Sequence, residues 1–250
     1  MKIFKRFNVN IKQKLEREQK KHKFQKDLAD LKNSITQERF AFREKDFWRC
    51  LDDANTSGLE GFDMHYVYHT AWAARKLAHT MPKEHVDISS YLYFVNIVSA
   101  FVPVKFYDYR PANLNLSNLD SNHADINCLP FENNSIKSLS CMHVVEHVGL
   151  GRYGDPVDYD ADLKAIKELK RVLAKDSNLF FVVPIGREAK IQFNAHRIYS
   201  KEMILEYFAN FELIEFAFIR RDGSEGLIID APNEIINNES YGCGCFWFKK

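Results

Sequence analysis

The sequence has few cysteines, and their number is odd: five among 250 residues. They are scattered along the chain, at Cys50, Cys128, Cys141, Cys243 and Cys245. Such a set does not form the framework of a small disulfide-stapled protein, so we expect a reducing compartment, the cytoplasm. Cys243-Gly-Cys245 lacks a second Cys/His pair at zinc spacing, and we interpret these cysteines as small residues on a strand.

Long hydrophobic runs are also missing. The longest uncharged stretch, residues 88–104, is interrupted by four polar side chains and a proline, and it is short for a membrane span of about 20 residues. The basic residues near Met1 are not followed by the apolar segment of a secretory signal. We therefore expect a cytoplasmic protein without a transmembrane helix.

A net charge of +1 suggests no charged partner, but the charge is unevenly distributed. Residues 1–26 contain ten Lys or Arg and two glutamates, whereas the other 224 residues contain 25 basic and 32 acidic side chains. We predict a basic helical arm over residues 1–45 and an acidic body over residues 46–250. Phe24, Leu28, Leu31 and Ile35 form one apolar stripe on this arm. The stripe indicates either a helix packed on the body or on a coiled-coil partner, or an amphipathic helix on an anionic membrane or other polyanion.

Strands and helices alternate from about residue 85 onward, without internal repeats. Helices are predicted over 59–80, 91–101, 160–174 and 200–210. Strands are predicted over 85–89, 104–109, 136–144, 178–186, 211–219 and 243–250. The alternation predicts a doubly wound α/β domain, and the last two strands suggest an antiparallel pair because no clear helix separates them. We expect residues 112–123 to be a polar link.

Acidic side chains end the first two predicted strands. Ligands of such sheets bind outside the carboxyl ends of the strands. Asp87 and Asp108 lie there, 21 positions apart, and a carboxylate can accept both hydroxyls of an adenosine ribose. The two acids favour a nucleotide ligand. No G-x-G-x-x-G follows the first strand, which disfavours a dinucleotide-dependent oxidoreductase.

Residues 124–148, ADINCLPFENNSIKSLSCMHVVEHV, resemble the core of class I S-adenosylmethionine-dependent methyltransferases of the type-11 group. The matching features are Asp125, Leu129-Pro130-Phe131, Asn133-Asn134-Ser135 and Val145-Glu146-His147. The resemblance spans roughly residues 83–220 and excludes the arm. It implies a Rossmann-like, seven-stranded sheet with an antiparallel last strand pair, and S-adenosylmethionine as cofactor.

The resemblance also implies roles for single residues. Asp87 would lie near the methionine part of the cofactor, and Asp108 would bind the ribose with Tyr109 against the adenine. Asp125 would approach the adenine amino group, with Ile126 beside the ring.

One motif of the family is missing. The family has glycines two and four residues after the first acid, where the backbone approaches the cofactor closely. Ser89 and Tyr91 occupy these positions, with Ser90 between them. Ser89 and Ser90 could still contact the cofactor, but the pocket must differ. The resemblance counts the strand predicted at 136–144 as the family's fourth. His143, at its end, would lie where the family lines the methyl-transfer site.

A narrower resemblance accounts for the missing glycines. Five blocks resemble a methyltransferase-like branch first described as a nematode domain of unknown function and also found near bacterial surface-polysaccharide genes. The blocks are HYVYH (65–69), HVDISS (85–90), YDYRP (107–111), EHVGLGRYGD (146–155) and FNAHRIYS (193–200).

The GLGRYGD loop, residues 149–155, comes soon after a predicted strand. We predict that Arg152 and Tyr153 bind substrate there, with Asp155 a catalytic candidate; the alternative is a tight surface turn. Beyond the strand predicted at 178–186, Asn194 and Arg197 are further substrate-binding candidates.

Three histidines are candidate catalytic residues: His143, His147 and His196. His147 and His196 are candidate general bases because an imidazole can remove a hydroxyl proton near neutral pH, although a structural hydrogen bond is the alternative for each. Glu146, His147, Asp155 and His196 could gather a divalent metal, but their spacings do not establish a site, so we predict no metal.

These residues together predict methyl transfer to an oxygen of a sugar, surface-glycan precursor or other small molecule. The N-P-P-Y-type sequence of many amino-methylating enzymes is missing, and the acidic body gives no support to a nucleic-acid substrate. The alternative is a non-catalytic module that keeps the fold and holds a glycan or a partner protein. The sequence predicts no oligomeric state.

Overall fold

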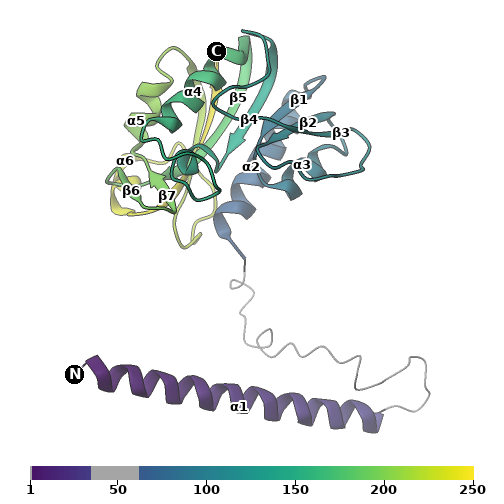
Figure 1. Ribbon diagram of the computed structural model, residues 1–250, viewed down its shortest axis with the longest axis vertical. Helices are drawn as coiled ribbons and strands as arrows, with labels where there is room; N and C mark the ends of the chain where they lie inside the picture. The colour runs from purple at the N-terminus through teal and green to yellow at the C-terminus, as the bar shows by residue number, and fades with distance from the viewer. Residues whose placement is uncertain (1, 35–61) are drawn as a thin grey trace. The chain divides into compact units, whose positions relative to one another are not determined.

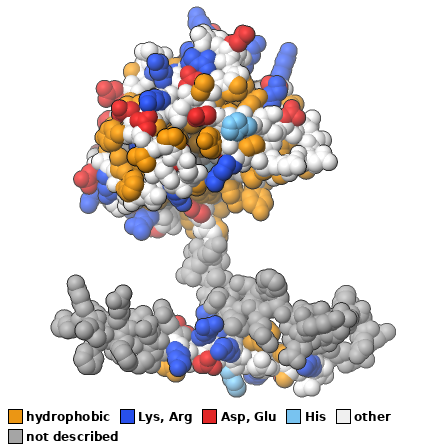
Figure 2. Space-filling view, in the orientation of Figure 1, with side chains coloured by type: hydrophobic (Ala, Val, Ile, Leu, Met, Phe, Trp, Pro, Cys, Tyr) orange, Lys and Arg blue, Asp and Glu red, His pale blue; other side chains and the backbone are white. Residues whose placement is uncertain are grey.

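The computed structural model describes residues 2–34 and 62–250, and the chain divides into two units, residues 1–62 and residues 63–250. In the first unit, helix α1 (Lys2–Ser34) confirms the predicted N-terminal helix. Phe24 and Leu28 are half-buried and Leu31 is exposed. Ile35 and the predicted boundary between residues 45 and 46 lie outside the described residues. Basic side chains are visible along the described part of α1 (Figure 2).

The second unit contains one large sheet in the order β3-β2-β1-β4-β5-β10-β8-β9 (Figure 1). Neighbours from β3 to β5 run parallel, and β10 runs antiparallel to both β5 and β8. The strands are β1 (His85–Ile88), β2 (Val104–Asp108), β3 (Leu119–His123), β4 (Ile136–Met142), β5 (Leu173–Ile185), β8 (Glu212–Ile219), β9 (Ile228–Ile229) and β10 (Gly242–Lys249). This arrangement confirms the predicted doubly wound α/β fold with antiparallel strands at its end.

Helices cover both faces of the sheet (Figure 1). One apolar core contains side chains of α4 (Ala161–Val172), α5 (Lys201–Tyr207) and α6 (Asn233–Asn238), and the other contains side chains of α2 (Met64–Thr80) and α3 (Leu92–Val98). The two cores explain why β5 reads as a continuous apolar run, since its residues 179–183 alternate between them.

Two helix starts follow directly from local hydrogen bonding. The Asp63 side chain accepts the backbone N–H of His65 at 2.9 Å and begins α2. Ser200 accepts the N–H of Met203 at 3.2 Å, which confirms the predicted cap of α5.

Three parts of the fold differ from the sequence prediction. The expected polar link at 112–123 contains β3, an edge strand in which only Leu119 is buried, so no apolar pattern announces it. The short helix α6 lies between β8 and β10, where no helix was predicted. Strands β6 (Lys190–Gln192) and β7 (His196–Ile198) form a separate hairpin after β5. Within residues 2–34 and 62–250, no helix combines the length and apolar character needed to cross a bilayer.

Candidate functional site

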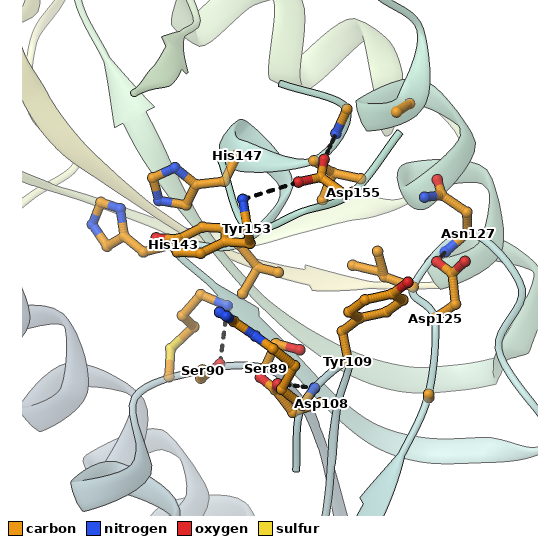
Figure 3. Close-up of a pocket in the computed structure, with 18 of the residues that line it drawn as sticks. Ser89, Ser90, Asp108, Tyr109, Asp125, Asn127, His143, His147, Tyr153 and Asp155 are labelled. Carbon is orange, nitrogen blue, oxygen red and sulfur yellow. Dashed lines mark hydrogen bonds between the residues drawn. The ribbon is translucent and has the colours of Figure 1, made fainter. Parts of the chain in front are cut away.

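A cavity of about 670 Å³ lies at the carboxyl ends of β1, β2 and β4. This is the edge at which ligands of such sheets bind. Ten of the predicted site residues line it: Ser89, Ser90, Asp108, Tyr109, Asp125, Ile126, His143, His147, Tyr153 and Asp155. In Figure 3, His143 and His147 lie on one side of the cavity, and Tyr109, Asp125 and Asn127 lie on the other.

Asp87 does not line the cavity, although it ends β1 as predicted. It is fully buried, where one carboxylate oxygen accepts the Ser90 N–H at 2.9 Å and the other accepts the Ser140 hydroxyl. Burial raises the pKa of Asp87 to about 6, partly opposed by the hydrogen bonds from Ser140 and Ser90. The side chain therefore orders the loop after β1 and does not face a ligand in the cavity.

The loop after β1 contains a left-handed residue at the first of the two positions where the resemblance predicts glycine. Ser89 occupies the position of the first glycine and has a left-handed backbone, with φ of 55°. Its N–H donates to the Tyr107 carbonyl at 2.8 Å, which fixes the turn.

Tyr91 occupies the position of the second glycine, and its side chain lines the cavity. The Tyr91 ring packs edge-on against Tyr66 from α2 and tilted against Tyr93 from α3, both at 5.2 Å between ring centroids. Tyr66, Tyr91 and Tyr93 thus form an aromatic wall, whose contribution from α2 the sequence did not predict.

Asp108 ends β2 and is half-buried at the cavity. One carboxylate oxygen accepts the Arg110 N–H at 2.7 Å, and the other has no hydrogen-bond partner among residues 62–250. The adjacent Tyr109 ring is 49% exposed, so it offers a free face to a planar ligand.

Asp125 and Ile126 follow β3 on the opposite wall. The Asp125 carboxylate accepts the N–H of Asn127 at 2.9 Å, which closes a local turn and aims both polar side chains at the same region (Figure 3). Ile126 is buried and contributes an apolar surface to the cavity. An acid, an amide and an aliphatic side chain here suit a flat, polar-edged ring such as adenine.

His143 lines the cavity, but both ring nitrogens have partners. Nδ1 lies 2.8 Å from a Glu146 carboxylate oxygen, and Nε2 lies 3.3 Å from Cys243 Sγ. His143 also has a left-handed backbone, with φ of 57°. This arrangement leaves neither nitrogen free to take a proton from a ligand in the cavity.

His147 is the histidine best placed as a general base. Its Nδ1 lies 2.7 Å from the Ala195 carbonyl oxygen, and a carbonyl only accepts, so this nitrogen carries the proton. In the neutral ring Nε2 is then an acceptor. The ring lines the cavity and packs edge-on against Tyr153.

Asp155 organises the GLGRYGD loop, residues 149–155, which we call the glycine loop. Its two oxygens accept the N–H groups of Gly149 at 2.6 Å and Tyr153 at 3.2 Å. Partial burial tends to raise the pKa of Asp155, but the backbone hydrogen bonds outweigh it and lower the pKa below its ordinary value. A carboxylate held ionised in this way is a weak base.

Besides Asp87, four predicted residues do not line the cavity: Arg152, Asn194, His196 and Arg197. Arg152 donates to the Ala195 carbonyl at 3.1 Å and lies over the Tyr153 ring. Arg197 is buried and donates to the Val148 and Tyr159 carbonyls at 2.6 and 2.9 Å, so it braces the glycine loop.

His196 and Asn194 lie in the β6–β7 hairpin, apart from the cavity lining. Asn194 is exposed, and His196 is half-buried. The pKa of His196 is lowered, chiefly by burial. Its Nε2 is buried without a hydrogen-bond partner in the part of the chain that the structure describes.

The strand order and the antiparallel β10 define the fold of class I S-adenosylmethionine-dependent methyltransferases. A family model described as "Caenorhabditis protein of unknown function, DUF268" matches residues 125–227. No curated protein matches the sequence.

This chain is similar to solved structures at low sequence identity. A candidate sarcosine dimethylglycine methyltransferase from Galdieria sulphuraria has a TM-score of 0.51 and 13% identity, over 74% of this chain and 86% of its own. A methyltransferase from Thermotoga maritima, dependent on S-adenosylmethionine, has a TM-score of 0.46 and 14% identity. The match covers 75% of this chain and 92% of that protein. A candidate methyltransferase from Bacillus halodurans has a TM-score of 0.47 and 14% identity. The match covers 70% of this chain and 96% of that protein.

Proposed function

We propose that the protein binds S-adenosylmethionine in this cavity and methylates an oxygen of a sugar or surface-glycan precursor. The position of Asp108 supports this proposal best. Its carboxylate ends β2 at the binding edge of the sheet, and one of its oxygens is free to accept the ribose hydroxyls.

The adenosine part of the cofactor fits the residues present. Tyr109 and Ile126 provide faces for the adenine, while Asp125 and Asn127 provide polar groups for its edge. The cavity of about 670 Å³ is within the usual size of small-molecule sites.

The methionine part of the cofactor would contact serine and tyrosine side chains here, where the resemblance predicts glycines. Asp87 is sequestered, so the Ser89 and Ser90 side chains and the Tyr91 ring are the groups that remain at this end. Because Tyr91 stands where the resemblance predicts a glycine, we expect weaker binding of the amino-acid part than of the adenosine part.

His147 is the proposed base for the reaction. Bound S-adenosylmethionine would supply an electrophilic methyl group, and the acceptor hydroxyl must lose its proton as the oxygen–carbon bond forms. His147 lines the cavity, and its Nε2, which lies 3.7 Å from a Glu146 carboxylate oxygen, is the ring nitrogen left to take that proton. Both nitrogens of His143 are engaged, by Glu146 and Cys243.

The aromatic wall supports a sugar as the acceptor. Tyr66, Tyr91 and Tyr93 line the cavity with apolar rings that carry hydroxyl groups. A sugar likewise combines apolar C–H faces with hydroxyl groups, so both parts of such a ligand find partners on this wall.

Calorimetric titration with S-adenosylhomocysteine tests cofactor binding. Replacing Asp108 with alanine removes charge-assisted hydrogen bonds to the ribose and should weaken binding about 10- to 100-fold. Asp120→Ala is the matched control, since Asp120 is an exposed acid on the neighbouring β3 that does not line the cavity. No heat at millimolar ligand, with Asp108→Ala indistinguishable from the unmodified protein, would refute the proposal.

Tyr91 also favours a second candidate, a non-catalytic module that holds a glycan without methylating it. A tyrosine in the place of a glycine narrows the methionine end of the pocket, and the aromatic wall alone could bind a sugar. Mass spectrometry of the freshly purified protein distinguishes the two. Co-purifying S-adenosylmethionine or S-adenosylhomocysteine supports the enzyme, whereas its absence together with glycan binding supports the module.

We further propose that the enzyme works in the cytoplasm, with the basic arm holding it at an anionic membrane surface. The ten basic residues among the first 26 support this location, because such a segment is attracted to anionic lipid head groups.

A further inference from the structure

Three side chains that the proposed methyl transfer does not use converge behind the His143 wall of the cavity. They are His65 from the first turn of α2, His143 after β4, and Cys243 in β10. Their ligand atoms all lie within 4.8 Å of one another, and all three side chains are buried. Two imidazoles and a thiol are a donor set that zinc prefers.

The cluster contains a polar group that otherwise has no function. His65 is only 4% exposed, and its Nε2 has no hydrogen-bond partner within residues 62–250. A buried nitrogen left unpaired is destabilising and calls for an explanation. Coordination of a metal ion would satisfy this nitrogen.

Glu146 strengthens the case because of its position relative to His143. It lies 2.8 Å from His143 Nδ1, so the opposite nitrogen, Nε2, points at Cys243. Histidines that bind metals usually donate their other ring N–H to a carboxylate or carbonyl in this way. The carboxylate holds the ring in the tautomer whose Nε2 lone pair faces Cys243, where an ion would take the place of the thiol proton.

The distances fit a small tetrahedral ion. Zinc bonds of about 2.0–2.1 Å to nitrogen and about 2.3 Å to sulfur place an N and an S ligand about 3.5 Å apart. His143 Nε2 and Cys243 Sγ are already 3.3 Å apart. His65 would need only a side-chain adjustment to complete the set.

We propose that His65, His143 and Cys243 bind one divalent zinc ion, with Glu146 orienting His143. Cys243 binds as the thiolate, and its proton passes to solvent. Three protein ligands leave a fourth position for water or another donor. The ion would tie α2, the end of β4 and β10 together behind the cavity. This site is independent of S-adenosylmethionine and goes beyond the proposed function.

Cobalt substitution tests the site on the full chain. The reduced protein is stripped with a chelator and titrated with Co²⁺, whose bond to a thiolate gives a charge-transfer absorption band. We expect saturation at one equivalent and displacement of cobalt by one equivalent of Zn²⁺.

Variants assign the ligands. Cys243→Ser should abolish the thiolate band, and Glu146→Gln should weaken zinc binding about 10- to 100-fold. Cys141→Ser is the matched control, since Cys141 is also a fully buried cysteine of the sheet but lies outside the cluster. The thiolate band of this variant should equal that of the unmodified protein.

The proposal is overturned if the unmodified protein shows no thiolate band, or if the band persists in Cys243→Ser. If Cys243→Ser fails to fold, X-ray absorption of the zinc-loaded unmodified protein decides instead: a shell of sulfur and imidazole nitrogen supports the site, and a shell of oxygen alone refutes it. Neither readout depends on cofactor binding, so failure here and failure of the methyltransferase proposal are distinguishable.

Discussion

Asp87 belongs to a chain of buried hydrogen bonds beneath the cavity. His85 Nδ1 and Nε2 each lie 2.8 Å from a serine hydroxyl, those of Ser138 and Ser140, and Ser140 donates to Asp87. Burial lowers the pKa of His85 to about 3, so the ring is neutral. The carboxyl group is thus supported by neutral dipoles, with no cation beside it among these contacts.

Asp87→Asn should reveal the energetic consequence of this arrangement. Burial raises the pKa of Asp87 to about 6 in the folded protein, above its ordinary value of 3.8. The folded state therefore binds the proton more tightly than the unfolded state, and the stability that this gives is present below about pH 4 and lost as pH rises through 6. Asparagine does not titrate. Relative to the unmodified protein, the variant should gain roughly 2 kcal/mol in free energy of unfolding between pH 4 and pH 7.

Urea unfolding at several pH values measures this difference. Asp120→Asn provides the control, because Asp120 is exposed on β3 and should show no such gain. A pH-independent difference between Asp87→Asn and the unmodified protein would contradict the prediction.

At the level of residues, the sequence predicts which strand ends carry polar groups, but not which side of the loop those groups face. Asp87 and Asp108 look equivalent in sequence, yet Asp87 turns inward to Ser140 while Asp108 reaches the cavity. His65 and Cys243 could not be paired at all from spacing, since 178 positions separate them and only the sheet order brings β10 next to α2.

At the level of elements, the conformation of the glycine loop is fixed by hydrogen bonds to side chains. Asp155 accepts two of its N–H groups, and Arg197 donates to the carbonyl of Val148 just before it. Gly149 has φ of 76°, and a Cβ atom there would lie 2.2 Å from the Asp158 carbonyl oxygen. The loop's shape thus depends on a backbone approach that only glycine permits.

Gly149→Ala should destabilise the protein by about 3–5 kcal/mol, because the methyl group meets backbone in addition to the strain of a left-handed alanine. Gly154→Ala is the matched control. Gly154 has φ of 86° but no atom within 4 Å of the added Cβ, so its cost should be about 1–2 kcal/mol. Chemical denaturation of both variants checks this, and equal losses would contradict the steric explanation.

The sequence predicts those elements that have a clear pattern of apolar residues. Strand β5 is bounded by α4 and buried on both faces, so its residues stand out in the sequence. Strand β3 pairs through its backbone at the edge of the sheet and needs few apolar side chains, and α6 has only six residues. Such elements are determined by their neighbours rather than by their own composition.

At the level of the whole molecule, the two units carry opposite charge. We expect the purified protein to sediment with vesicles of phosphatidylglycerol and phosphatidylcholine but not with phosphatidylcholine alone. Raising the salt to about 0.5 M should release it, since the Debye length then falls to a few ångströms.

A variant in which six of the ten basic residues among residues 1–26 become glutamine should bind at least tenfold more weakly. Six Lys→Gln changes in the second unit serve as the control and should leave binding unchanged. Equal binding by both variants would show that the arm is not the membrane contact.

The position of β10 constrains how the sheet can assemble. It is the strand furthest along the sequence, yet it lies between β5 and β8, and β8 reaches the rest of the sheet only through it. Strand β8 therefore cannot join the sheet until β10 has paired with β5. Until then, β5 is an apolar strand with one unpaired edge. Pairings over such separations form slowly. The incomplete sheet, which ends at β5, is the species most exposed to aggregation, and the addition of β10 to this edge is the step that ends the exposure.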